Sequence, residues 1–340
     1  MTFDARPHHQ PIAATFRGEH PENVHHGSFA VVDEAGRLLA SSGDVQFPVY
    51  ARSSLKPFQA IPLIAKAPEM MRLEDADVAL LCASHSGEPK HTERVGALLN
   101  KIGASERDLA CGCHTPYFYA ATGQLPTPGD TYTRLQHNCS GKHAGMLMLA
   151  KALGQSLDTY LDADGAVQAE VARSVSHFCG IPQTALVGGI DGCSAPNYAV
   201  PLQALAHAFA KLTRSAPDPV YGDAPLRVAR AMSHHPDLVS GQGRNDLILM
   251  HAGRGDWVSK VGADGVQAIA SFSRGIGIAA KCSDGNLTPL MVALVDALNQ
   301  LGWIDAQSRS ALAALLPARL KNAAGIEVGE MRSVLRLNPH

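Results

Sequence analysis

The segment from Ser28 to Ala40 constrains the fold most, because it predicts antiparallel strand pairing near the start of the chain. Its sequence, SFAVVDEAGRLLA, places an Asp-Glu-Ala-Gly turn between two apolar runs, which is the pattern of a β-hairpin. We expect further strands at Ala185 to Val187 and at Val266 to Phe272, beside glycine-rich turns. A mainly antiparallel sheet is therefore favoured over a regular βαβ alternation.

Apolar residues at helical spacing predict several helices around this sheet. The first spans Ser54 to Lys66, where Pro57 is tolerated in the opening turn. The segment Ser215 to Asp223 is expected to be a loop. Further helices are expected at Lys90 to Ile102, His143 to Leu153, Asp164 to Cys179, Ala195 to Thr213 and Leu287 to Leu301.

The chain of 340 residues is long enough for a large core, and we expect residues 1–340 to form a single domain with two lobes. The predicted class is α/β (α+β), with a central, mainly antiparallel sheet flanked by helices and a separate helical lobe.

Composition excludes several classes of protein. A formal charge of -2 with 5% aromatic residues argues against nucleic-acid binding, because such surfaces need a basic field and stacking side chains. No apolar run approaches the roughly 20 residues that a membrane span requires. An odd number of cysteines, seven, indicates thiols in a reducing compartment. Because Met1 to Pro11 also lacks the pattern of a secretory signal, we expect a cytoplasmic protein.

The first catalytic candidate is the pair Ser53 and Lys56, within the sequence Ser-Ser-Leu-Lys. Three residues of helix place the two side chains on one face. A desolvated lysine near other cations loses its proton more readily and can activate a serine hydroxyl as a nucleophile. The same spacing also arises by chance in long chains, so the pair needs support from other motifs.

A second candidate is the segment Cys82 to Pro89 (CASHSGEP), which follows the apolar run Val78 to Leu81. We expect a loop at the end of a strand, which is a common place for functional residues. The alternative is structural, since Ser84 or Ser86 could cap a helix beginning near Pro89.

A third candidate is Lys260, in the sequence Ser-Lys-Val-Gly, where small neighbours allow close approach to a ligand. Its alternative is an exposed lysine of a hairpin. The order Ser-x-x-Lys, Ser-x-polar, Lys-x-Gly resembles that of serine β-lactamases and penicillin-binding proteins. Ser86 departs from the asparagine that often holds the third position of the middle element.

A metal site is suggested by two short segments, His137 to His143 (HNCSGKH) and Gly188 to Cys193 (GGIDGC). Thiolates of Cys139 and Cys193 suit zinc, with a histidine or a carboxylate completing a tetrahedral set. Neither segment contains a Cys-x-x-Cys pair, so buried structural thiols are the alternative.

Taken together, six motifs in order resemble the rhizobial-type L-asparaginases, also called the asparaginase II-like family, over nearly the whole chain. The motifs are RGEHPENVHHGSFAVVD (Arg17 to Asp33), RSSLKPFQA (Arg52 to Ala60), CASHSGEPKH (Cys82 to His91), HNCSGKHAGM (His137 to Met146), DGCSAPNYAVPL (Asp191 to Leu202) and SKVGADGV (Ser259 to Val266).

The resemblance implies a fold like that of serine β-lactamases and glutaminases, and two Ser-Lys pairs, Ser53 with Lys56 and Ser84 with Lys260. It implies a zinc ion near the substrate pocket that supports substrate binding, and a homodimer. The zinc ligands that it implies, besides water, are Cys139, Lys142 and Cys193.

The expected reaction is hydrolysis of L-asparagine to L-aspartate and ammonia through an acyl-enzyme on Ser53. Arg52 is expected to pair with the substrate α-carboxylate and Asp191 with its α-amino group. His143 is either a pocket residue or a helix N-terminal histidine bonded to backbone. The rival functions are a glutaminase or β-lactamase-like serine hydrolase, and a non-catalytic zinc-binding or thiol protein.

Overall fold

The computed structural model describes residues 7–67 and 71–340. Residues 1–6 of the Met1 to Pro11 segment, in which no secretory signal is expected, lie outside this range. The strands are β1 (Gln10–Arg17), β2 (His20–Asp33), β3 (Leu38–Ser42), β4 (Pro48–Tyr50), β5 (Val187–Ile190), β6 (Pro196–Pro201), β7 (Trp257–Gly262), β8 (Val266–Ser271), β9 (Ile276–Cys282), β10 (Leu320–Lys321), β11 (Glu327–Ser333) and β12 (Asn338–Pro339).

Helices make up most of the remaining regular structure. The α-helices are α1 (Lys56–Lys66), α2 (Asp75–Leu81), α3 (Pro89–Lys101), α4 (Tyr117–Thr122), α5 (Ser140–Ala152), α6 (Ala166–Cys179), α7 (Leu202–Leu212), α8 (Ala224–His234), α9 (Pro236–Val239), α10 (Asn245–Ala252), α11 (Leu287–Gln300) and α12 (Ala306–Leu312). Short 3-10 helices include η1 (Arg52–Leu55), directly before α1, and η6 (Gln183–Ala185), before β5.

The main sheet is antiparallel and runs in the order β10-β11-β1-β2-β9-β8-β7, with β3 beside β2 and β12 beside β3. The predicted hairpin is confirmed, because β2 and β3 pair with Phe29 opposite Ser42 and Val32 opposite Leu38. A small second sheet has the order β4-β6-β5.

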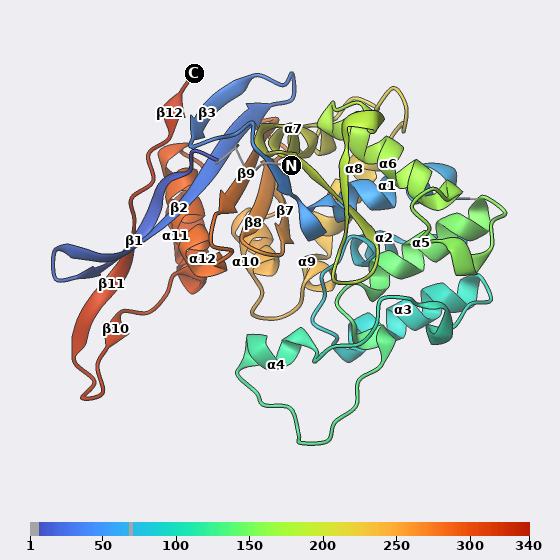
Figure 1. Ribbon diagram of the computed structural model, residues 1–340, viewed down its shortest axis with the longest axis horizontal. Helices are drawn as coiled ribbons and strands as arrows, with labels where there is room; N and C mark the ends of the chain where they lie inside the picture. The colour runs from blue at the N-terminus through green and yellow to red at the C-terminus, as the bar shows by residue number, and fades with distance from the viewer. Residues whose placement is uncertain (1–6, 68–70) are drawn as a thin grey trace, which may run out of the picture.

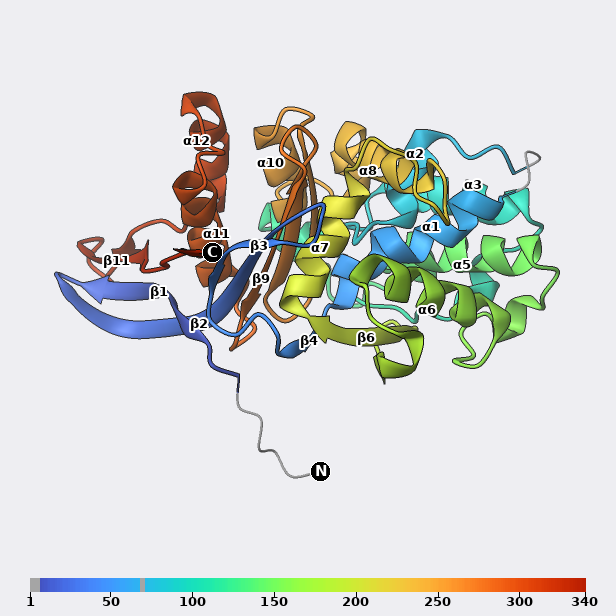
Figure 2. The same cartoon turned by 90° about the horizontal axis from the view of Figure 1, so that it is seen from above.

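Helices cover both faces of the main sheet. Figure 2 shows α11 and α12 on one side and α7 on the other, with the helical lobe of α1, α5, α6 and α8 beyond α7. Along β2, Phe29 and Val31 belong to the apolar cluster under α11, whereas Ala30 and Val32 belong to the larger cluster on the opposite face. Alternation of side chains along a strand explains why this run is apolar at every position.

The predicted fold class is confirmed: a mainly antiparallel sheet flanked by helices, with a helical lobe beside it (Figure 1). The expected helices at Lys90 to Ile102, His143 to Leu153, Asp164 to Cys179 and Leu287 to Leu301 correspond to α3, α5, α6 and α11, with ends shifted by at most a turn. The segment Ser215 to Asp223 consists of turns held by a bridge between Asp218 and Gly222.

Three local predictions were wrong. The segment expected to form a helix from Ala195 to Thr213 is divided into β6 and α7. Pro201 has no backbone N–H and disfavours helix before it, so it ends β6 and takes the N-cap position of α7. The strand expected at Ala185 to Val187 is divided between η6 and the start of β5. The run Val78 to Leu81 belongs to helix α2 rather than to a strand, since four apolar residues alone do not distinguish the two.

Two glycines allow the close contacts that bring the motifs together. A side chain at Gly141 would collide with the carbonyl oxygen of Leu80, so only glycine lets the start of α5 lie against the end of α2. A methyl group at Gly262 would lie 2.5 Å from the carbonyl oxygen of Ala51, where β7 passes η1. Among the described residues, no helix is long and apolar enough to cross a membrane.

Candidate active site

A serine hydroxyl bonded by two buried lysines lies at the centre of the site. Lys56 begins α1, Ser84 lies in the loop after α2, and Lys260 lies on β7. The Oγ atom of Ser84 accepts hydrogen bonds from Lys56 Nζ at 2.9 Å and from Lys260 Nζ at 3.0 Å. Exposed fractions are 1% for Lys56, 3% for Ser84 and 0% for Lys260, so these polar groups depend on one another rather than on water.

Ser53 lies on the wall of the same pocket but does not bond Lys56. The Nζ atom of Lys56 instead contacts the Ala83 carbonyl at 2.5 Å, Ser84 Oγ, and Cys139 Sγ at 3.2 Å. Ser53 belongs to η1, whereas Lys56 begins α1 and reaches into the interior. The structure therefore brings Ser53 to the pocket, and it brings Lys56 to the other serine.

Asp246 anchors Lys260 from the side opposite Ser84, and sequence reasoning missed this residue. Its carboxylate, fully buried, lies 3.5 Å from Lys260 Nζ and accepts the backbone N–H of Val261 at 3.0 Å. Burial, reinforced by Lys56 and opposed by the Asp246 carboxylate, lowers the pKa of Lys260 to about 8. Lys260 is thus a proton donor whose pKa lies near neutrality.

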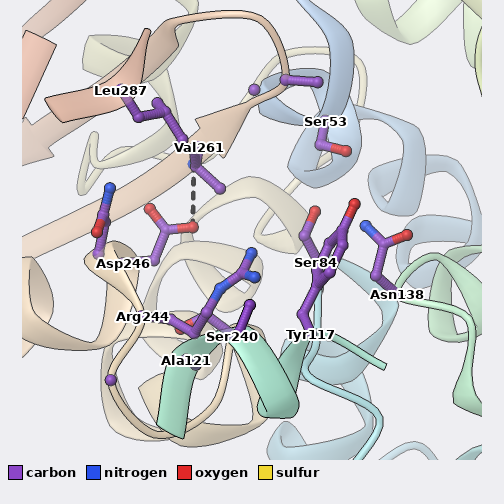
Figure 3. A pocket seen from close by; sticks show the side chains of 15 residues that line it. Ser53, Ser84, Tyr117, Ala121, Asn138, Ser240, Arg244, Asp246, Val261 and Leu287 are labelled. Carbon is purple, nitrogen blue, oxygen red and sulfur yellow. Dashed lines mark hydrogen bonds between the residues drawn. The ribbon is translucent and has the colours of Figure 1, made fainter. Parts of the chain in front are cut away.

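The pocket has a volume of about 340 Å³, and we call it the serine pocket. Figure 3 shows Ser53 and Ser84 facing it from one side and Arg244 and Asp246 from the other. Its lining residues are Ser53, Ser84, Tyr117, Ala120, Ala121, Asn138, Ser240, Gly243, Arg244, Asn245, Asp246, Val261, Gly262, Ala263 and Leu287. Tyr117 and Arg244 lie outside the motifs, and the only local signal was the glycine-rich sequence GQGRND ending at Asp246.

The three residues proposed for zinc lie together next to the Ser-Lys group. Lys142 Nζ bonds Cys193 Sγ at 2.8 Å, and Cys139 contacts Lys56. A hydrogen bond with Cys193, assisted by the charges of Lys56 and Lys142, holds the pKa of the Cys139 thiol well below its ordinary value although burial opposes this. Because the metal-binding form of cysteine is the thiolate, the donor set suits zinc.

His143 adjoins this thiol cluster rather than the serine pocket. Its Nδ1 atom bonds the Tyr160 hydroxyl at 2.7 Å, and its buried Nε2 atom has no hydrogen-bond partner among the described residues. Burial lowers the pKa of His143 to about 4, so the ring is neutral at pH 7. The expected backbone bond of a helix N-terminal histidine is therefore not what holds this ring.

Arg52 and Asp191 pair with each other. The guanidinium of Arg52 lies 2.8 Å from Asp191 and also bonds Asp264. Arg52 lines a neighbouring cavity with Asn197 and Lys281, not the serine pocket. Arg52 also has a φ of 53°, an unusual backbone conformation for a residue with a side chain, directly before Ser53.

The structural alternatives for two motifs were wrong. The N-cap position of α3 is held by Glu88, whose side chain makes no capping hydrogen bond, and not by Ser84 or Ser86. The Ser86 hydroxyl donates to the carbonyl of Ser240 at 2.8 Å. Lys260 is not an exposed hairpin lysine, since it is fully buried on β7.

Residues 13–333 match the family of L-asparaginase II. The chain belongs to that family. Membership covers nearly the whole chain and places it among the amidohydrolases. No curated protein matches the chain significantly.

Solved structures with a similar arrangement include Mglu in its native form, with 15% identity, a TM-score of 0.46, and 82% of this chain aligned. The chain spans 65% of the length of Mglu. A β-lactamase from Mycobacterium bovis is also similar, at 15% identity and a TM-score of 0.43. The alignment covers 82% of the present chain and 95% of the β-lactamase.

Proposed function

We propose that this member of the L-asparaginase II family hydrolyses the side-chain amide of L-asparagine to L-aspartate and ammonia through an ester on Ser53. The observation that carries the proposal is the Ser84 hydroxyl held between two buried lysine amines, at 2.9 and 3.0 Å, on the wall of a pocket that Ser53 also lines. A hydroxyl between two amines can pass protons in either direction.

In the acylation step, Ser53 Oγ attacks the carbon of the carboxamide, and Lys56, one turn further along the chain, accepts its proton. Lys56 is buried and shares the Ser84 hydroxyl with Lys260, so the two amines and the serine form one connected path for protons. Ser84 gives its proton to the amide nitrogen, the C–N bond breaks, and ammonia leaves. Lys260 then returns a proton to Ser84.

Hydrolysis of the ester reverses these transfers. Water attacks the ester carbonyl while the neutral Lys260, through Ser84, takes its proton. Lys56 returns the other proton to Ser53 Oγ, and L-aspartate is released. Backbone N–H groups at the start of η1 are the natural donors to the oxyanion in both steps.

The zinc proposal rests on the donor set formed by Cys139, Lys142 and Cys193. Two thiols and one amine, all buried, can hold zinc after losing their protons. Zinc bound there would withdraw charge near the substrate and fix the start of α5. The chemical steps above use only the serines and lysines.

Recognition of the rest of the substrate involves the ion pair of Arg52 and Asp191 beside η1. Burial works against the charge of Asp191, but Lys142 and Arg52 hold its pKa below the ordinary value, so it stays anionic and suits an ammonium group. His143, bonded to Tyr160, would help to hold the thiol cluster rather than contact the substrate. The homodimer expected from the resemblance and the cytoplasmic location stay predictions.

The test compares release of ammonia and aspartate from L-asparagine with ammonia from L-glutamine and with turnover of a chromogenic β-lactam. The proposal expects the highest kcat/KM for L-asparagine, although one methylene in a simple pocket gives only ~10–200-fold discrimination. A chain that hydrolyses the β-lactam and not L-asparagine would overturn it in favour of a β-lactamase-like enzyme. A chain that binds zinc and cleaves none of the three would favour the non-catalytic reading.

A further inference from the structure

The serine pocket is lined by one charged side chain, Arg244, that forms no ion pair within the described residues. Two charged side chains line it, Asp246 and Arg244. The buried carboxylate of Asp246 is occupied by four donors: Lys260 at 3.5 Å, and Ser259, Gln267 and the Val261 N–H at 2.9 to 3.0 Å. Its oxygens are therefore committed to the fold, and a ligand entering the pocket meets the guanidinium of Arg244.

Arg244 lacks the ion pair that arginines with restricted solvent access usually have. Within residues 7–67 and 71–340, no carboxylate lies at ion-pair distance from its guanidinium, which instead packs 4.7 Å from the centre of the Tyr117 ring. Burial lowers the pKa of Arg244, but an arginine keeps its charge at any physiological pH. The guanidinium lines the serine pocket with donors that no carboxylate of the described residues occupies, so a ligand in the pocket can bind them.

Arg52 provides the contrast. Its guanidinium already bonds two carboxylates, Asp191 at 2.8 Å and Asp264, so a third would have to displace one of them. Arg52 also faces the neighbouring cavity rather than the serine pocket. Of the two arginines near Ser53 and Ser84, Arg244 is therefore the one whose N–H donors are available to a carboxylate of the substrate.

The direction of the Arg244 side chain fits such a role. Figure 3 shows it extending between Asp246 and Ser84 into the serine pocket. The positive charge of Arg244 is also close enough to help lower the pKa of Lys260. A guanidinium stacked on an aromatic ring has its plane fixed, and its parallel N–H groups match the two oxygens of a carboxylate.

We propose that Arg244, held by Tyr117, receives the α-carboxylate of the substrate. This proposal rests on the amidase function proposed above and deepens it, because it defines the substrate class: a primary amide that carries a carboxylate a short chain away.

The experiment compares L-asparagine with its α-amide, in which the same side chain is joined to a neutral head group. Cleavage of the side-chain amide is followed as formation of aspartate or of aspartate α-amide, and an analogue that is bound but not cleaved is measured as a competitive inhibitor. Wild type is compared with Arg244→Met, Arg244→Lys and the matched Arg52→Met, after circular dichroism has shown that each variant is folded.

The wild-type protein should prefer L-asparagine, and Arg244→Met should lose on the order of 10²-fold or more of its kcat/KM for L-asparagine while its affinity for the α-amide changes little. Arg244→Lys should recover part of the preference, because lysine restores the positive charge but not the two parallel N–H donors of a guanidinium. Arg52→Met should keep the preference for L-asparagine over its α-amide even if its overall activity falls, because Arg52 also holds Asp191.

The proposal is overturned if Arg244→Met retains the wild-type preference, or if the preference disappears in Arg52→Met instead. An Arg244→Met variant that loses affinity for both compounds equally also overturns it, because that loss would not depend on the carboxylate. Failure of the amidase function is a separate result, namely a wild type that cleaves neither compound.

Discussion

Lys260 Nζ lies 3.0 Å from Ser84 Oγ, and neither side chain is appreciably exposed to water. On its other side Lys260 faces Asp246, and Lys56 shares the same serine. The ability of Ser84 to give up and regain a proton therefore depends on charges that are all inside the protein, and the first prediction follows from them.

The pH profile of kcat/KM should have an alkaline limb near the Lys260 pKa of about 8, because acylation needs Lys260 protonated. Burial lowers this pKa most; among the neighbouring charges, Asp246 raises it, whereas Lys56 and Arg244 lower it further. Replacing Asp246 by asparagine removes the raising influence, so the limb should move to lower pH.

The control for this shift is Asp305→Asn, which removes a carboxylate paired with Arg254 at the surface. It should leave the alkaline limb where it is in wild type. A limb that stays in place in Asp246→Asn would show that Lys260 is not the group whose deprotonation ends activity.

Ser84→Ala should reduce kcat by roughly 10²–10⁴-fold, the range of general acid-base catalysis, while the fold is retained. The two lysines lose their shared acceptor, but each keeps a backbone carbonyl, that of Ala83 for Lys56 and that of Val261 for Lys260. Stopped assays of ammonia release, with thermal melting as the control for folding, measure the effect. Wild-type kcat in Ser84→Ala would remove this serine from the mechanism.

Gly262→Ala should lower activity through geometry alone. The added methyl would lie 2.5 Å from the Ala51 carbonyl and 2.9 Å from Val266 Cβ, so β7 must move away from η1 and carry Lys260 with it. Gly96 in α3 is the matched position, because a methyl there meets nothing within 4 Å. Gly96→Ala should keep full activity and gain about 0.5–1 kcal/mol of stability. Equal kcat in the two variants would contradict the packing argument.

Zinc content should depend on the thiol cluster. Cys193→Ser is the better variant, since Cys139 contacts Lys56 and its loss would disturb the catalytic lysine directly. We expect Cys193→Ser to lose bound zinc, measured per chain by elemental mass spectrometry, and to show a raised KM with a smaller change in kcat. Cys113→Ser, at an exposed thiol, should bind as wild type does. If Cys193→Ser still binds zinc, the zinc site does not include Cys193.

Much of the fold and of the candidate site can be predicted from sequence where the signal is local. The β2–β3 hairpin has its turn in the few residues between Val32 and Leu38, which pair with each other. Cys139 and Lys142 likewise share the first turn of α5. In such segments the covalent spacing already fixes which side chains are neighbours.

The remainder depends on contacts between distant segments. Arg244 directly precedes α10 and Asp246 lies in its first turn, where the glycine-rich sequence is the only local signal. Their role becomes visible only because β7 and α4 contact them in the fold. The same applies to Lys56, whose sequence neighbour is Ser53 but whose bonded partner in the fold is Ser84, 28 residues further on. Strand β11 could not be predicted from the sequence, because its residues include several charged ones and show no alternating apolar pattern.

The measurement that bears most directly on the account is identification of the covalent intermediate. Protein mixed with L-asparagine and quenched in acid within milliseconds should contain a population heavier by one aspartyl group, and peptide mapping should place that group on the hydroxyl of Ser53. A label found on Ser84 instead, or none in a preparation that is releasing ammonia, would contradict the mechanism.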